Sequence, residues 1–181
     1  MNSKALIRES IPEDLESIIT VERAAFRSNE EASLVCDILD DPSAEPILSL
    51  LAFEAEKPVG HIIFSLANFD PPLAVQGRIL GPLAVIPSRQ KSGIGSLLVE
   101  KGIAILVDRG VDWVFVLGHE SYYPRFKFSP AIPQGFHPPY PIPGEFTNAW
   151  MAKSLTPTCI VPYKGKVIPA ESFNDPRYWG E

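Results

Sequence analysis

The sequence predicts one α/β (α+β) domain, with a mixed, twisted central sheet of about six or seven strands flanked by helices. Three observations predict this fold class. Short apolar runs alternate with stretches of helical spacing, as in sheets covered by helices. One helical stretch lies directly between two apolar runs, which is the arrangement of a βαβ unit. The 181 residues, 45% of them hydrophobic and 21% charged, suffice for a single sizeable core.

The first part of the chain reads as a strand, two helices and a hairpin. The expected elements are, in order, a strand over 5–8, helices over 12–26 and 32–39, and a hairpin with strands over 47–56 and 59–67. Ser10 is the expected cap of the first helix, with Pro12 at an early helical position. Residues 68–73 contain Asp-Pro-Pro and predict a loop.

The middle of the chain contains the predicted βαβ unit. Its expected elements are a strand over 76–85, a helix over 92–109 and a strand over 111–117, followed by a short helix over 118–126 and a last strand over 149–155. Gly81-Pro82 falls inside the first of these strands, where a proline is tolerated at a bulge. We therefore expect a parallel strand pair that splays apart and exposes backbone groups for a ligand.

The turn between that strand and its helix carries Gln90, Gly93 and Gly95 in a Q-x-x-G-x-G pattern. The first N–H groups of a helix have no intrahelical acceptor, and the helix dipole places partial positive charge there. Glycine lets a ligand approach the backbone closely, and Arg89 and Lys91 add positive charge. The turn therefore predicts a pyrophosphate site. It matches neither the Walker pattern nor the Rossmann pattern, which needs a third glycine.

The pattern V-x-P-x-x-Q-x-x-G-I-G-x-x-L, which begins at Val85 and ends at Leu98, closely resembles the acetyl-CoA loop of the GNAT superfamily of N-acyltransferases. The resemblance implies a mixed, twisted sheet, acetyl-CoA as co-substrate and transfer of the acetyl group to an amine by direct attack. We expect the strand end to pair with the pantetheine arm and the turn to hold the pyrophosphate. The expected coenzyme-binding residues are Leu83, Ala84, Val85, Gln90, Lys91, Ser92, Gly93, Ile94, Gly95 and Ser96.

Two residues are the expected catalytic groups. In the GNAT superfamily a tyrosine often stands five residues before a phenylalanine in the short helix after the βαβ unit, and Tyr123 stands so before Phe128, although the usual glycine is Lys127 here. A phenol can protonate or hydrogen-bond a departing thiolate. His119 is the best-placed general base, although a capping or packing role suits it equally. Other candidates for the base are Glu54, Asp70 and Glu120, whereas His61 reads as structural.

Composition excludes several classes of partner and binding site. A net charge of −6 argues against a nucleic-acid surface, and no apolar run is long enough to span a membrane or resembles a signal peptide. Cys36 and Cys159 have no metal-site spacing, so we expect no metal, two reduced thiols and a cytoplasmic location. The expected partner is a small-molecule or peptide amine. Two alternatives to an N-acetyltransferase are a non-catalytic domain that binds acyl-CoA and a protein in which the glycine turn is purely structural.

The expected boundary of the GNAT-like domain is residue 155. Residues 156–181 form a tail rich in proline and aromatic residues, which we expect to pack on the same domain. A contact with a second subunit, and hence a homodimer, is the other interpretation. The acceptor amine, the acyl chain length and the identity of the base do not follow from the residues.

Overall fold

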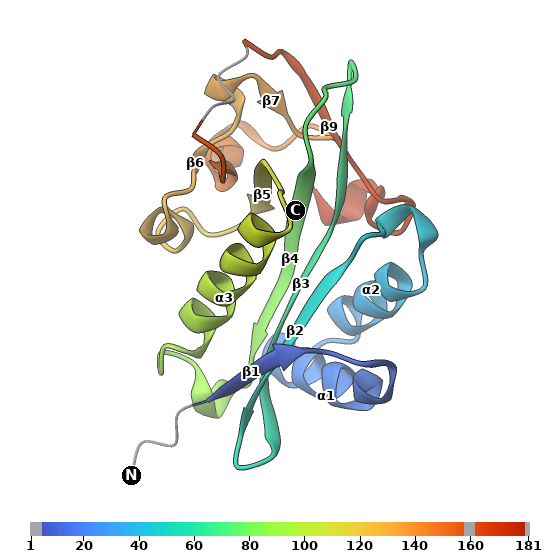
Figure 1. Cartoon of the computed structure of the whole chain (residues 1–181), viewed down its shortest axis with the longest axis vertical. Coiled ribbons are helices and arrows are strands. Elements are labelled where there is room, and N and C mark those ends of the chain that lie inside the picture. Colours follow the sequence, from blue (N-terminus) through green and yellow to red (C-terminus); the bar gives the residue numbers. More distant parts are fainter. Residues whose placement is uncertain (1–4, 158–161, 180–181) are drawn as a thin grey trace.

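A mixed sheet runs through the middle of the molecule, and helices cover both of its faces (Figure 1). The computed structural model describes residues 5–157 and 162–179. Within these residues the sheet has nine strands, in the order β1-β2-β3-β4-β5-β8-β6, with β9 pairing to both β3 and β7. The predicted fold class is confirmed, and the count exceeds the expected six or seven because two-residue strands and the tail also join the sheet.

The first half of the chain follows the expected order of elements. These are β1 (Leu6–Glu9), α1 (Leu15–Phe26), α2 (Glu30–Leu39), β2 (Leu48–Glu54) and β3 (Lys57–Asp70). Two details differ from the expectation. The Ser10 hydroxyl does not cap a helix but donates to Ser49 Oγ at 2.7 Å. Strand β3 continues through part of the expected loop, because residues 67–70 pair with β9.

The predicted βαβ unit is present as β4 (Gly77–Val85), α3 (Ile94–Asp108) and β5 (Trp113–Leu117). The two strands are parallel, and their pairing ends at Ile79 and Phe115 although both strands continue. The register between β3 and β4 shifts so that Ile63 lies opposite Gly81 and Pro82, which is the bulge expected from the sequence. Beyond this bulge β4 and β5 no longer pair, and the backbone of β4 is available to a ligand.

The last part of the chain adds short strands to the sheet. They are β6 (Ser129–Pro130), β7 (Phe136–His137), β8 (Trp150–Ser154) and β9 (Gly165–Pro169). The expected helix over 118–126 is only a 3₁₀ turn over Tyr123–Phe126, and the strand β9 in the tail was not expected at all. Antiparallel pairing of β9 with β3 places residues 166–169 in the sheet.

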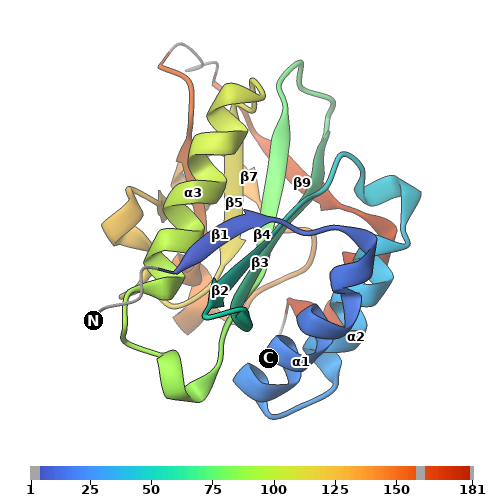
Figure 2. The same cartoon turned by 60° about the horizontal axis from the view of Figure 1, so that its bottom comes forward.

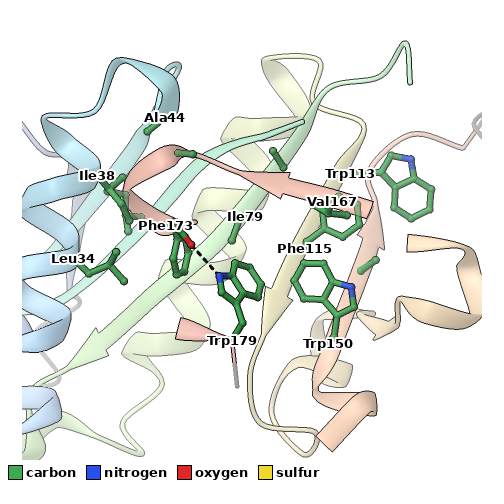
Figure 3. Close-up of a cluster of buried hydrophobic side chains, with 14 of the residues drawn as sticks. Leu34, Ile38, Ala44, Ile79, Trp113, Phe115, Trp150, Val167, Phe173 and Trp179 are labelled. Atoms are coloured by element: carbon green, nitrogen blue, oxygen red, sulfur yellow. Dashed lines mark hydrogen bonds between the residues drawn. The ribbon is translucent and has the colours of Figure 1, made fainter. Parts of the chain in front are cut away.

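Each face of the sheet has its own apolar cluster. Helix α3 covers one face, while α1, α2 and the C-terminal segment cover the other (Figure 2). On the second face Phe115 stacks on Trp150 at 5.6 Å, and Trp179 meets Trp150 edge-on at 5.5 Å (Figure 3). Leu97 of α3 does not join the cluster beneath its helix and is 40% exposed.

A chain of buried polar groups crosses the second face. His61 on β3 bonds through Nδ1 to Glu22 Oε1 of α1 at 2.5 Å and through Nε2 to Ser49 Oγ of β2 at 2.9 Å. His61 and Glu22 are fully buried. Burial raises the pKa of Glu22, and the hydrogen bond from His61 opposes that shift. His61 is therefore part of the core, as the sequence indicated.

Candidate active site

The turn between β4 and α3 presents its backbone N–H groups to the surface. Lys91 and Gly93 adopt left-handed conformations, with φ of 61° and 93°. Within the described chain, no hydrogen bond engages the N–H groups of residues 91–96, and the first bond of the helix comes from Leu97 N to Gly93 O. The Gln90 side chain donates to Val85 O at 3.1 Å and so ties the turn to the strand end. Consecutive unpaired amides at a helix start form an anion-binding arrangement.

These amides face a cavity of about 620 Å³, which we call the loop cavity. It is formed by the ends of α1, β4 and β5, the turn, the start of α3 and the 3₁₀ turn after β5. Its lining residues are Phe26, Leu83, Val85, Arg89, Gln90, Lys91, Gly93, Gly95, Ser96, Gly118, His119, Tyr122, Tyr123 and Arg125. Three of these described residues are cations and none is a carboxylate, although Arg89 pairs with Glu54 at 2.5 Å. An anionic ligand suits such a wall.

Most of the residues expected at the site do line this cavity, and three do not. Ala84 is 1% exposed and lies opposite His61, and Ile94 is 3% exposed in the core beneath α3. Ser92 points elsewhere and donates its hydroxyl to Arg89 O. Only the backbone of these three residues can take part. Sequence reasoning missed Arg125, whose guanidinium stacks 4.5 Å above the ring of Tyr122.

Tyr123 is buried at the innermost part of the loop cavity. It is 7% exposed, and its ring packs edge-on against Tyr122 at 5.1 Å and Phe128 at 5.7 Å. Gly118 makes room for this ring, since a Cβ there would lie 2.3 Å from Tyr123 Cε2. Burial raises the pKa of the Tyr123 phenol well above its ordinary value. The phenol therefore stays protonated and can act only as a proton or hydrogen-bond donor near neutral pH.

His119 lies at the rim, just after the end of β5. Its side chain is exposed, and its Nδ1 lies 3.0 Å from Ser121 Oγ. It lines both the loop cavity and a neighbouring cavity of about 670 Å³ that is also lined by Glu120 and Glu145. The position allows exchange of protons with solvent.

A third, smaller cavity adjoins the loop cavity where β4 and β5 separate. This inner cavity has a volume of about 310 Å³ and shares Phe26, Leu83 and Tyr123 with the loop cavity. Phe173, Tyr178 and Trp179 of the tail form its far wall. A cavity lined by unpaired amides and cations thus adjoins, beside a buried phenol, a smaller cavity with mostly apolar walls.

Residues 13–124, more than half of the chain, match the model of the acetyltransferase (GNAT) family. The chain belongs to the GNAT family. This match includes the bulged strand, the glycine turn and Tyr123, and the resemblance of the chain to the GNAT superfamily is thereby confirmed.

Relatives of this GNAT chain are N-acetyltransferases by name, and the chain is an acyltransferase. It is 49% identical to the uncharacterized N-acetyltransferase YjhQ of Escherichia coli K12 over 148 residues. The aligned region covers 79% of this chain and 80% of YjhQ. A crystal structure of the GNAT protein YhbS from Escherichia coli in complex with CoA superposes with a TM-score of 0.87 at 30% identity, over 97% of this chain and 94% of YhbS. The crystal structure of a GNAT acetyltransferase from Brucella melitensis in complex with acetyl-CoA superposes with a TM-score of 0.75 at 28% identity, over 95% of this chain and 99% of that protein.

The part of this GNAT chain that the structure describes contains neither a candidate membrane helix nor a candidate metal site. No helix there is long and apolar enough to cross a membrane. No group of three or more His, Cys, Asp or Glu side chains there is placed to hold a metal ion. Cys36 is a free thiol, and Cys159 lies outside the described residues.

Replacing Gly95 by alanine should weaken CoA binding at least tenfold, which is about 1.4 kcal/mol. A Cβ at this position would lie 2.7 Å from Tyr122 Oη and would stand between the ligand and the backbone. Alanine is a better helix former than glycine, so the free energy of unfolding should not fall with the affinity. Calorimetric titration with CoA and urea unfolding measure the two quantities. Ala104→Gly, on the exposed face of α3, should lower the free energy of unfolding and leave the Kd for CoA unchanged. A Gly95→Ala variant with normal affinity for CoA would contradict the expectation.

Proposed function

We propose that this protein transfers an acetyl group from acetyl-CoA to a primary amine by direct attack in a ternary complex. The observation that carries the proposal is the junction of the two cavities. The loop cavity has unpaired amides and cations suited to phosphates, and it meets the inner cavity at Leu83 and Tyr123. YhbS and the Brucella melitensis protein bind CoA and acetyl-CoA, which supports the choice of coenzyme.

Each group of the site has an assigned part in this reaction. The pyrophosphate binds the N–H groups of residues 91–96, and the pantetheine arm lies along Leu83 to Val85, where β4 has left β5. The thioester then lies near Tyr123. Backbone N–H groups of β4 in this region can polarise its carbonyl.

The chemical step needs a neutral amine and a stabilised leaving group. An acceptor that arrives as an ammonium ion first loses one proton, which His119 accepts and passes to solvent. The amine nitrogen bonds to the carbonyl carbon, the C–S bond breaks, and sulfur leaves with the bonding electrons. The second nitrogen proton is released, and the Tyr123 phenol donates a hydrogen bond or proton to the thiolate. The products are an N-acetyl amine, CoA thiol and one net proton.

Thermal unfolding with CoA tests the first half of the proposal. CoA at a hundredfold excess over its Kd should stabilise the protein by about 2.7 kcal/mol and raise the Tm. Release of free thiol from acetyl-CoA, dependent on an added amine, tests the second half. Stabilisation without thiol release for any amine of a broad panel would favour a non-catalytic acyl-CoA-binding domain. No stabilisation by CoA would reduce the glycine turn to a structural element.

A further inference from the structure

The inner cavity lies where an acceptor would meet the coenzyme. Its walls include Gly81, Pro82 and Leu83 at the bulge of β4, and Leu117 at the end of β5. It shares Tyr123 with the loop cavity. A group bound in the inner cavity therefore contacts the same stretch of β4 as the inner end of the loop cavity.

One charged side chain lines this cavity among the described residues, and it is Glu31. Glu31 lies in the first turn of α2, where the helix dipole favours an ionised carboxylate. The Ser28 hydroxyl donates to Glu31 Oε2 at 2.6 Å and so fixes the carboxylate. No other hydrogen bond joins this carboxylate to the described chain, so Oε1 can accept one from a ligand. The carboxylate charge is opposite to that of the loop cavity wall.

The remaining wall of the inner cavity is almost entirely apolar. Figure 3 shows Leu34 of α2 on one side and Phe173 and Trp179 of the tail on the other, over the face of the sheet at Ile79. The hydrogen bond from Trp179 Nε1 to Phe173 O, 2.9 Å long, holds the two tail residues in place. Apolar walls favour an apolar ligand body, and a second charge on the ligand would lose its hydration without a partner.

We infer that Glu31 binds the ammonium group of the arriving acceptor, before this group loses its proton, and that the acceptor is a small, singly charged primary amine with an apolar or aromatic body. The inference rests on the proposed transfer reaction, for which Glu31 is a substrate-binding residue. A carboxylate on the acceptor would lie in the same small cavity as Glu31 and be repelled. Amino acids with free carboxylates and polyamines are therefore poor acceptors.

Binding of 2-phenylethylamine to the CoA-loaded protein, followed by calorimetry, tests the inference without relying on turnover. We expect it to bind at least tenfold more tightly than phenylalanine, which has the same aromatic body and an added carboxylate. Glu31→Gln should weaken binding of 2-phenylethylamine at least tenfold and leave the Kd for CoA unchanged. Glu30→Gln, which removes a neighbouring exposed charge from the same helix turn, should change neither Kd.

Three results would overturn the role of Glu31. The first is that Glu31→Gln and the unchanged protein bind 2-phenylethylamine with equal affinity. The second is that the unchanged protein binds phenylalanine as tightly as 2-phenylethylamine. The third is that it binds neither amine. Thiol release from acetyl-CoA is measured separately with the same amines. Binding that depends on Glu31 without thiol release would instead leave the amine site in place and refute acetyl transfer.

Discussion

Tyr123→Phe should lower kcat for amine-dependent thiol release by about 100-fold while the Kd for CoA stays within twofold. The variant loses only the hydroxyl, which makes no hydrogen bond to the described residues. The edge-on packing of the ring against Tyr122 and Phe128 is retained. We therefore expect the substitution to slow departure of the thiolate without lowering the free energy of unfolding. Steady-state kinetics and calorimetric titration with CoA measure the two quantities.

Tyr122→Phe is the matched control for this experiment. Tyr122 is half-buried, and its hydroxyl lies next to Gly95 at the start of α3. Its loss should raise the KM for acetyl-CoA and keep kcat within about threefold. Equal kcat in Tyr123→Phe and the unchanged protein would remove Tyr123 from the mechanism. A large loss of kcat in Tyr122→Phe alone would transfer the acid role to Tyr122.

His61→Ala should lower the free energy of unfolding by about 3 to 5 kcal/mol. Glu22 Oε1 and Ser49 Oγ both bond to His61 in the interior, and each would lose that partner. Glu22 Oε2 is already buried without a hydrogen-bond partner among the described residues, so the carboxyl has no alternative. Urea unfolding at neutral pH measures the loss. A change below 1 kcal/mol would show that the pair contributes little.

Glu22→Gln is the matched variant for the same pair. Glutamine keeps an acceptor for His61 Nδ1, so we expect a loss of only about 1 kcal/mol. It also tests the direction of the Glu22 pKa, which burial raises. The folded protein binds the proton of the Glu22 carboxyl more tightly than the unfolded chain does. The contribution of Glu22 to the free energy of unfolding therefore falls as the pH rises above about 4.3. The stability of the unchanged protein relative to Glu22→Gln should therefore decrease over that range, and an increase would contradict the assignment.

Sequence reasoning could predict the βαβ unit and its turn because their signals are local. Gly81-Pro82 marks the bulge, and Gln90, Gly93 and Gly95 mark a turn that closes within a few residues. Each of these residues acts through its own backbone conformation or hydrogen bonding. Such effects depend little on distant parts of the chain.

The walls of the inner cavity could not be predicted in the same way. Phe26, Glu31 and Trp179 come from three separate segments, and only packing of α1, α2 and the tail against the sheet brings them together. Strand β9 was missed for a similar reason. Its five residues, GKVIP, place only two β-branched residues between Gly165-Lys166 and Pro169, a run too short to predict a strand, and pairing with β3 and β7 places them in the sheet.

The C-terminal wall has a consequence for how this enzyme can diversify. The match to the family ends at residue 124, whereas Phe173, Tyr178 and Trp179 lie well beyond it. Recombination or drift in that last segment would reshape the inner cavity while the glycine turn remained unchanged. One wall of the inner cavity can therefore change in sequence independently of the segment that forms the glycine turn.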